Sequence, residues 1–294
     1  MEWCEYRMVM RPKNEQLQSA YVGSALRGAY GHALRRLSCV MRRPVCTGCP
    51  IEASCIYTSL FEPRVPASAG VMTKYNRAPV PFVLLADSPE DPLKKDLNVG
   101  FRLFGQTIQH APLVLHAFRE AASRGLGKGR FPYEVTEVHQ NGQDQINDPA
   151  LPLSHGPPER AETQIEWELV TPLRLMSAGK LMTPDRFDVA ALAMGLLRRI
   201  GLLHSFYAPA KELPEFATLK SSAARLRVTL ADLRWFGLLR HSSRQKSTQS
   251  MSGMLGRIGI DCSDAPEWRR YLAWAPIVHL GKNTTMGLGR IRVI

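Results

Sequence analysis

The sequence predicts an α+β protein made of two similar halves, and three observations lead to this prediction. The chain has 294 residues, which exceeds the usual single-domain length and favours two domains. Segments with strand-like alternation and helix-like periodicity follow one another in the same order before and after a central stretch. That stretch, residues 140–160, is rich in Gly, Pro, Asn and Asp and is typical of a linker. We therefore expect domains at residues 1–155 and 156–294.

The first half offers a strand, a helix, two strands, a helix and a strand. Residues 1–10 alternate as a strand does, and residues 21–37 place apolar side chains at helical spacing, although glycines interrupt them. Each interior glycine costs a helix about 1 kcal/mol, which predicts that something approaches this backbone closely. The other candidates are strands at 81–86, 99–108 and 133–139 and a helix that begins after Pro112.

The second half repeats this order. Residues 186–207 form a strongly apolar helix that should be buried on most sides. The other candidates are strands at 165–175, 225–237 and 256–262, a helix at 267–280 and a last strand after residue 290. Strand, helix, two strands, helix, strand is the order of the split βαβ unit. The prediction is two tandem ferredoxin-like (RRM-like) βαββαβ domains, with a cysteine-rich insertion at 39–62 in the first.

Charge is the unusual feature of the composition. The chain has 38 Lys and Arg against 26 Asp and Glu, a formal net charge of +12. This excess attracts polyanions, so nucleic acid is the expected partner. We expect no membrane partner, because the sequence shows no basic amphipathic helix, no signal-peptide core and no apolar run near the roughly 20 residues of a membrane span. A cytoplasmic protein is expected.

A glycine-rich stretch, GKNTTMGLGR at 281–290, precedes the last four residues. Its lysine is misplaced for a Walker A loop and no helix can follow, so binding of a nucleoside triphosphate is disfavoured. Glycines at this density predict exposed backbone N–H groups that cradle phosphates, with a cation at each end. The residues concerned are Gly281, Lys282, Gly287, Gly289 and Arg290. The alternative is a glycine-rich loop without a binding role.

A second basic segment, residues 240–256, is too polar for a core. Its side chains suit sugar and phosphate contacts in RNA, where shape and the 2′-OH dominate recognition. The candidates are Arg240, His241, Arg244, Gln245 and Lys246. A solvated loop would have a similar composition.

Four of the six cysteines cluster with the spacing C-x6-C-x2-C-x5-C: Cys39, Cys46, Cys49 and Cys55. Four thiolates can close a tetrahedral zinc site, and the same ligands could hold an iron–sulfur cluster. Free cytosolic thiols are the other reading. Four protein ligands leave no open position for water, so such a metal would be structural.

Three stretches carry a family resemblance: GSALRGAYGHALRR, CTGCPIEASCIYTSLFEP, and SSRQ…GMLG…PIVHLGKNTTMGLGR at the C-terminal end. Together they resemble the CRISPR-associated precursor-crRNA processing endoribonucleases of the RAMP superfamily, over about half of the chain. The resemblance implies tandem ferredoxin-like domains, binding to CRISPR repeat RNA and cleavage that needs no metal cofactor. It also implies other CRISPR effector subunits as partners.

RNA cleavage without a metal ion requires a base, an acid and cationic groups from the protein. The 2′-OH upstream of the scissile phosphate attacks, and the products are a 2′,3′-cyclic phosphate and a 5′-OH. A base takes the 2′ proton, an acid can protonate the leaving oxygen and cations stabilise the phosphorane. The resembled family often places a catalytic histidine in or near its first helical region. His32 lies there, and its helical spacing from Arg35 and Arg36 puts all three on one face.

Other catalytic candidates remain open. His32 could be a surface or capping residue, and His241 is the next candidate because it lies in the basic segment. Since some members of the resembled family rely on arginine or tyrosine, we also consider Arg27, Tyr30 and Arg42. We expect His204 in the core and His279 as a support of the glycine-rich loop. The alternative function is a non-catalytic RNA-binding subunit of a CRISPR ribonucleoprotein effector complex.

Overall fold

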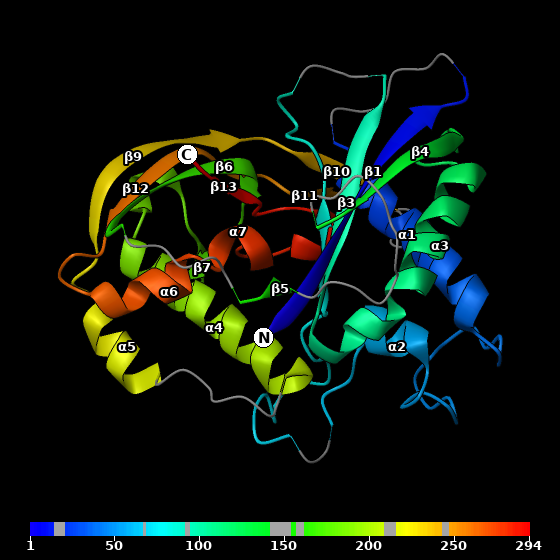
Figure 1. Cartoon of the computed structure of the whole chain (residues 1–294), viewed down its shortest axis with the longest axis horizontal. Helices are drawn as coiled ribbons and strands as arrows, with labels where there is room; N and C mark the ends of the chain where they lie inside the picture. The colour runs from blue at the N-terminus through cyan, green and yellow to red at the C-terminus, as the bar shows by residue number, and fades with distance from the viewer. Residues whose placement is uncertain are drawn as a thin grey trace. The chain divides into compact units, whose positions relative to one another are not determined.

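The computed structural model describes residues 1–14, 21–66, 69–91, 95–141, 154–156, 162–208, 216–242 and 247–294 (Figure 1). It divides into two compact units. Unit 1 comprises Met1–Ala86, Glu90–His155 and Leu202–Lys211, and unit 2 comprises Asp87–Pro89, Gly156–Gly201 and Glu212–Ile294. Much of the expected linker at 140–160 lies outside the described residues.

Unit 1 contains an antiparallel sheet in the spatial order β2-β3-β1-β4, with β5 paired to β1. Its elements are β1 (Glu2–Pro12), α1 (Gly23–Ser38), α2 (Ile56–Phe61), β2 (Phe82–Leu85), β3 (Leu97–Phe104), η1 (Gly105–His110), α3 (Ala111–Arg124), β4 (Tyr133–Gln140) and β5 (Ser154–His155). Helices α1 and α3 pack side by side (Figure 1). This strand order is that of the ferredoxin-like unit, which confirms the predicted fold.

A ladder of aromatic rings joins the sheet of unit 1 to its helices. Tyr6 of β1 stacks on Phe101 of β3 at 5.1 Å between ring centroids, and Phe101 stacks on Phe118 of α3 at 5.1 Å. Phe118 in turn stacks on Tyr30 of α1 at 4.5 Å. All four side chains are buried, and offset aromatic pairs contribute about 0.5–1.5 kcal/mol each beyond their buried area. The ladder fixes which face of α1 turns inward.

The close approach predicted for the glycine-containing helix α1 is confirmed at Gly31. A Cβ atom there would lie 2.4 Å from the Phe61 ring of α2. Phe61 could not pack against the helix at this distance if residue 31 carried a side chain. The approaching group is therefore part of the chain itself. The neighbouring Gly28 has open space around it.

Unit 2 contains a second antiparallel sheet, in the order β13-β6-β12-β9. The order matches that of unit 1, since the first strand again lies between the third and the fourth. The elements of the second half are β6 (Gln164–Leu173), β7 (Met176–Ser177), β8 (Lys180–Leu181), η2 (Pro184–Arg186), α4 (Val189–Tyr207), α5 (Phe216–Ala223), β9 (Arg227–Phe236), β10 (Leu239–Ser242), β11 (Ser247–Ser250), β12 (Gly253–Asp261), η3 (Pro266–Trp268), α6 (Arg269–Leu272), α7 (Ala275–Val278), η4 (Thr284–Met286) and β13 (Ile291–Val293). The last residues of α4, from Leu202 on, belong to unit 1.

Two element predictions were wrong in extent. The single helix expected at 267–280 is three short turns, η3, α6 and α7. Pro276 lies in the first turn of α7, and it has no N–H with which to continue a hydrogen-bonded helix from α6. The strand expected at 99–108 ends at Phe104, where η1 begins.

Helix α4 corrects the expectation that no apolar segment approaches a membrane span. The helix has 19 residues and contains an 18-residue window with a mean hydropathy of 1.3, so it is long and apolar enough to cross a membrane by length and composition. Half of this segment is buried inside the protein, and core helices pass the same test. The helix also carries His204, which is buried as expected.

Candidate RNA interface and catalytic helix

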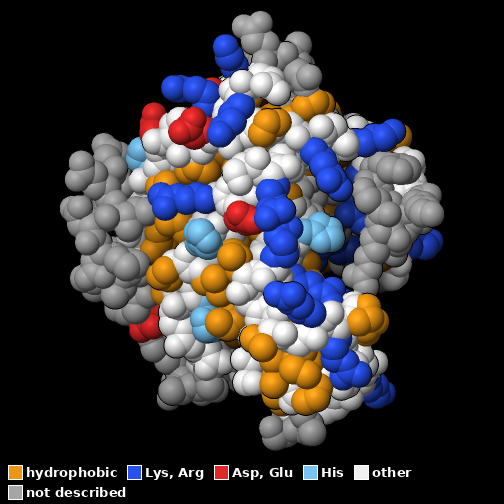
Figure 2. Space-filling model, turned by 90° about the vertical axis from the view of Figure 1, so that its right-hand side faces the viewer, with side chains coloured by type: hydrophobic (Ala, Val, Ile, Leu, Met, Phe, Trp, Pro, Cys, Tyr) orange, Lys and Arg blue, Asp and Glu red, His pale blue; other side chains and the backbone are white. Residues whose placement is uncertain are grey.

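The outer face of α1 carries His32. Gly28, His32 and Arg36 follow one another at intervals of four residues, so they share the helix face, and all three are exposed. Within the described residues, no hydrogen bond or ion pair involves the His32 imidazole. Figure 2 shows Lys and Arg side chains, with histidines among them, on the side of the molecule where Figure 1 places α1 and α3. The imidazole is thus open to a ligand.

The two arginines expected beside His32 point to different partners. Arg35 donates to the carbonyls of Arg43 and Pro44 in the cysteine-rich loop, and its guanidinium lies 5.6 Å from the Tyr57 ring centroid. Arg36 donates to Glu120 of α3 at 3.2 Å. Arg35 therefore holds the loop, and its place beside His32 in a phosphate-facing trio stays a prediction.

The Arg36 ion pair belongs to a small charged cluster on α1 and α3. Arg124 donates to the same Glu120 oxygen at 2.5 Å. The hydrogen bond from Arg124 is the main cause of a lowered pKa at the Glu120 carboxyl, and the charge of Arg124 and the hydrogen bond from Arg36 add to the effect. One carboxylate against two guanidiniums leaves the cluster with a net positive charge.

The structure excludes Tyr30 as a catalytic group. Its side chain is 1% exposed and lies in the aromatic ladder, and burial raises the pKa of its phenol despite the charge of Arg27. The error has a simple origin, since residue 30 lies two positions from His32 and so on the other side of the helix.

The two arginine candidates lie at different places. The Arg27 guanidinium lies 4.3 Å from the centroid of the Phe61 ring. Arg42 is exposed in the loop after α1, with φ of 49°.

We expect Tyr30→Phe to leave RNA cleavage unchanged and to keep or raise stability. The buried hydroxyl has no hydrogen-bond partner within the described part of the chain. Removing an unsatisfied buried hydroxyl should raise the free energy of unfolding by about 1 kcal/mol. Thermal denaturation and single-turnover cleavage measure the two effects. A stable variant that fails to cleave would contradict the assignment of Tyr30 to the core.

The glycine-rich loop of unit 2 is held tightly by its own chain. Gly281, Gly287 and Gly289 all have positive φ, of 77°, 83° and 65°. A Cβ atom at Gly281 would lie 2.4 Å from the Arg174 carbonyl oxygen, and one at Gly289 would lie 1.8 Å from that of Leu280. The glycines are therefore required by backbone conformation and by close packing within the protein.

This packing uses part of the expected backbone N–H cradle, which stays a prediction for the rest of the loop. The N–H groups of six loop residues already donate to oxygens of the protein: Lys282, Met286, Gly287, Leu288, Gly289 and Arg290. The loop also carries two cationic side chains that could contact a ligand. Lys282 is exposed and Arg290 is partly exposed.

The two basic segments predicted to bind RNA meet in unit 2. The segment after residue 238 forms the two-stranded hairpin β10–β11, in which His241 pairs with Thr248. Arg240 donates to the Gln249 side chain at 2.6 Å, and its other terminal nitrogen lies 3.4 Å from the Met286 sulfur in the glycine-rich loop. The side chain of His241, and all of Arg244, Gln245 and Lys246, lie outside the described residues.

Comparison with known proteins decides the family. A family described as an N-terminal domain matches residues 1–156, and the family "CRISPR-associated endoribonuclease Cas6" matches residues 167–291. Over residues 167–291 the chain belongs to the CRISPR-associated endoribonuclease Cas6 family. No curated protein matches significantly.

Solved Cas6 structures share the fold of this Cas6-family chain. One Cas6 product complex is 17% identical, with a TM-score of 0.63, and the match covers 100% of this chain and 99% of that one. A second Cas6 product complex is 16% identical, with a TM-score of 0.58 and 100% of both chains covered. Thermus thermophilus Cas6 is 15% identical, with a TM-score of 0.59 and coverage of 100% and 98%.

Sequence reasoning missed Thr171, which secures the glycine-rich loop of this Cas6-family chain. Thr171 is fully buried near the end of β6. Its hydroxyl donates to the Gly287 carbonyl at 2.7 Å and accepts from the Arg290 N–H at 2.9 Å. The partners are 116 and 119 residues away in sequence, so no local pattern could have revealed the contact. His279, which precedes the loop, is fully buried, and its role as a support of the loop stays a prediction.

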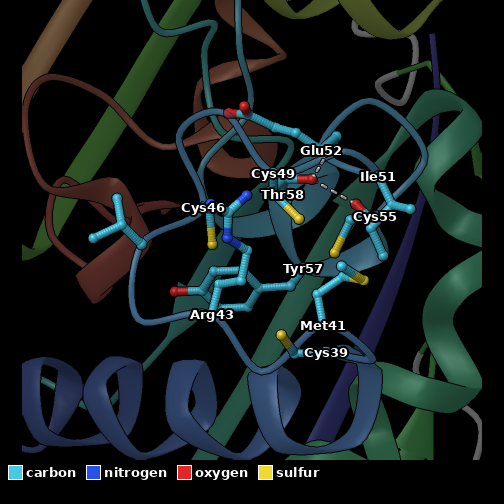
Figure 3. A pocket seen from close by; sticks show the side chains of 11 residues that line it. Cys39, Met41, Arg43, Cys46, Cys49, Ile51, Glu52, Cys55, Tyr57 and Thr58 are labelled. Atoms are coloured by element: carbon cyan, nitrogen blue, oxygen red, sulfur yellow. Dashed lines mark hydrogen bonds between the residues drawn. The ribbon is translucent and has the colours of Figure 1, made fainter.

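The four clustered cysteines line one pocket in unit 1 (Figure 3). Burial raises the pKa of the Cys46 thiol; Arg35 opposes this effect, and Cys39 and Cys55 add to it. Among the residues that the structure describes, however, no group of three or more His, Cys, Asp or Glu side chains has the geometry of a metal site. The four thiols line the same pocket, but they do not have the arrangement of metal ligands.

Proposed function

We propose that this Cas6-family protein binds CRISPR repeat RNA and cleaves precursor crRNA without a metal ion in the reaction. One observation carries the catalytic part of the proposal: the first helix presents an exposed histidine, His32, next to a cationic cluster. Histidine can take or give a proton near neutral pH, and RNA supplies its own nucleophile in the 2′-OH.

The proposed reaction is an internal transesterification. The His32 imidazole accepts the 2′-OH proton, directly or through water, while the 2′-oxygen forms a bond to phosphorus. The bond from phosphorus to the 5′-oxygen breaks, and that oxygen takes a proton from an acid. The products are a 2′,3′-cyclic phosphate and a 5′-OH, and no oxidant or reductant is consumed. A nearby guanidinium such as that of Arg36 would stabilise the charge of the phosphorane.

The proposed role of unit 2 is to bind and position the RNA strand. Its support is the contact between the basic hairpin and the glycine-rich loop through Arg240 and Met286. This contact brings Arg240 of the hairpin next to the glycine-rich loop, which carries Lys282 and Arg290. Such contacts to phosphate position a nucleic acid, whereas base contacts specify its sequence. The hairpin and loop should therefore contribute affinity that depends on salt concentration.

The proposed partners are repeat RNA and other CRISPR proteins, and the proposed place of action is the cytoplasm. A complex titled "Partial Cas6-RT-Cas1--Cas2 complex" contains a chain with a TM-score of 0.61 at 10% identity, of which this protein covers 46%. That likeness concerns the fold, and it makes CRISPR proteins the first partners to test.

The test is single-turnover incubation with the repeat RNA of the same genome in excess EDTA. We expect cleavage at one position, a product that polynucleotide kinase can label at its 5′ end without prior dephosphorylation, and a cyclic phosphate on the other fragment. A substrate with a single 2′-deoxy nucleotide before the scissile phosphate should bind equally well and remain intact. Cleavage that appears only after a divalent metal is added would overturn the mechanism.

One observation favours a second candidate, a non-catalytic RNA-binding subunit. Catalytic histidines are usually oriented by a hydrogen-bonded neighbour, and His32 has none within the described residues. In this case the protein would bind repeat RNA tightly and leave its length unchanged. The same assay separates the two functions.

We expect Lys282→Ala to weaken RNA binding and to make it less sensitive to salt. Lys282 is exposed at the start of the glycine-rich loop, and losing one phosphate contact should lower the slope of log affinity against log salt by about 1. Filter binding at several salt concentrations measures both quantities. Lys220→Ala, an exposed lysine on α5, is the matched control and should behave as wild type. An unchanged slope for Lys282→Ala would leave the loop a purely structural role.

A further inference from the structure

The loop between α1 and α2 carries its four cysteines at its two ends and in its middle. Cys39 is the residue that caps the C-terminal end of α1, with its N–H bonded to the Arg35 carbonyl at 2.9 Å, and Cys55 is the N-cap residue of α2. Cys46 and Cys49 lie between them and form one tight turn, in which the Cys49 N–H donates to the Cys46 carbonyl at 3.0 Å. The four thiols thus come from the two helix ends and from the middle of the loop.

All four cysteines line one pocket, and Figure 3 shows their sulfur atoms gathered around a common space beside the Tyr57 ring. The cavity has a volume of about 20 Å³. A cavity of roughly 10–15 Å³ is enough for one water molecule. The cavity therefore has room for one ion.

The loop is held by hydrogen bonds, and it buries little apolar surface. Three of its apolar side chains are exposed rather than packed: Val40, Met41 and Val45 have 80%, 43% and 61% of their surface accessible. Between α1 and α2 the described chain contains turns but no helix or strand. Small segments that bury too little apolar surface commonly depend on disulfides or a structural metal. A thiol-bound metal would supply the missing constraint.

Cations already surround the cysteines. Arg35 donates to the carbonyls of Arg43 and Pro44, Arg43 donates to the Gly48 carbonyl at 2.9 Å, and Arg64 pairs with Glu52 at 2.7 Å. Four thiolates around one divalent ion carry a net charge of −2. The guanidiniums of Arg35 and Arg43 lie where they would offset that charge.

We propose that Cys39, Cys46, Cys49 and Cys55 bind one Zn²⁺ ion as a structural centre that joins the end of α1 to the start of α2. Binding replaces four S–H bonds by four Zn–S bonds and releases four protons to water, with no change of oxidation state. The thiols must close by movement of the loop, since they are gathered around the cavity without metal-site geometry among the described residues. The centre would act on α1, the helix that carries His32, by fixing its C-terminal end.

The first test measures metal in the protein purified without chelators after growth with added zinc. Mass spectrometry of the metals should find one zinc per chain, with neither iron nor acid-labile sulfide. Cys46→Ser should reduce the zinc to background, while Cys262→Ala, a buried cysteine at the end of β12 in unit 2, should keep it. Wild-type protein without zinc after this preparation and after reconstitution, or with iron and sulfide in its place, would overturn the proposal.

A second test uses wild-type protein and therefore avoids any folding defect of the variants. Replacement of zinc by Co²⁺ should produce the thiolate-to-cobalt and tetrahedral d–d absorption bands of a four-thiolate site. Removing the metal should accelerate hydrogen exchange at the C-terminal turn of α1 and at α2, and leave exchange in β12 unchanged. Absence of the thiolate bands, unchanged exchange in α1, or disulfides among the four cysteines in protein kept under reducing conditions would contradict the centre.

Discussion

His32→Ala should reduce the single-turnover rate of repeat RNA cleavage by about 10²–10⁴-fold and leave RNA affinity at the wild-type value. The exposed imidazole is the proposed group that takes the 2′-OH proton, and alanine cannot take it. The side chain lies on the outer face of α1, away from the aromatic ladder, so its removal should not destabilise unit 1. Rates from gel-resolved cleavage and affinities from filter binding on the same preparations give both quantities.

The matched control is His116→Ala. His116 is an exposed histidine on α3, the helix that packs beside α1, and the proposed reaction does not use it. This variant should cleave at the wild-type rate. If His32→Ala cleaved normally, the proton transfer would belong to another group, and His241, Arg27 or Arg42 would be tested next. If it lost affinity as well as rate, His32 would be a binding residue.

Gly289→Ala should destabilise unit 2 by at least about 3 kcal/mol. Residue 289 has φ of 65°, a conformation that costs an L-residue roughly 1–2 kcal/mol. The added Cβ would also lie 1.8 Å from the Leu280 carbonyl oxygen, which is backbone and cannot move as a side chain can. The same two residues are joined by the hydrogen bond from the Leu280 N–H to the Gly289 carbonyl at 2.9 Å, so relief of the clash would break it.

Because a domain is typically stable by only 5–15 kcal/mol, this loss should be visible as a large fall in the unfolding temperature. Chemical denaturation followed by tryptophan fluorescence measures it directly. Gly237→Ala is the control, since Gly237 has open space around it and its φ is not positive. That variant should remain within about 1 kcal/mol of wild type. Equal stability of the two variants would show that the loop is free to rearrange.

The order of the elements could be predicted from the sequence because it depends on local periodicity. Alternation in residues 1–10 and helical spacing in 21–37 depend on neighbours a few positions away, and the structure has a strand and a helix there. The repetition of this order in both halves then predicted two ferredoxin-like sheets. Prediction failed at 267–280, where Pro276 interrupts the helical pattern.

The candidate site was predictable in composition but not in contacts. The exposure of His32 follows from its helix face, yet the partners of Arg35 and Arg36 lie in a loop and in α3. Tyr30 was wrongly assigned because residue type alone did not reveal the aromatic ladder around it. The glycine-rich loop was predictable to the same extent. Its many glycines indicate that there is no space for side chains, but they do not identify the neighbouring groups that occupy that space.

By itself the sequence determined the two-domain α+β organisation, the cationic character, the spacing of the cysteines and the position of His32. Each depends on residue types and on spacing along the chain. Only the tertiary structure decided that the backbone of Arg174 and Leu280 occupies the space beside Gly281 and Gly289, and that six N–H groups of the loop donate to the protein itself. The reason is physical: hydrogen bonds and packing between residues more than 100 positions apart, such as Thr171 with Gly287, exist only once the chain has folded.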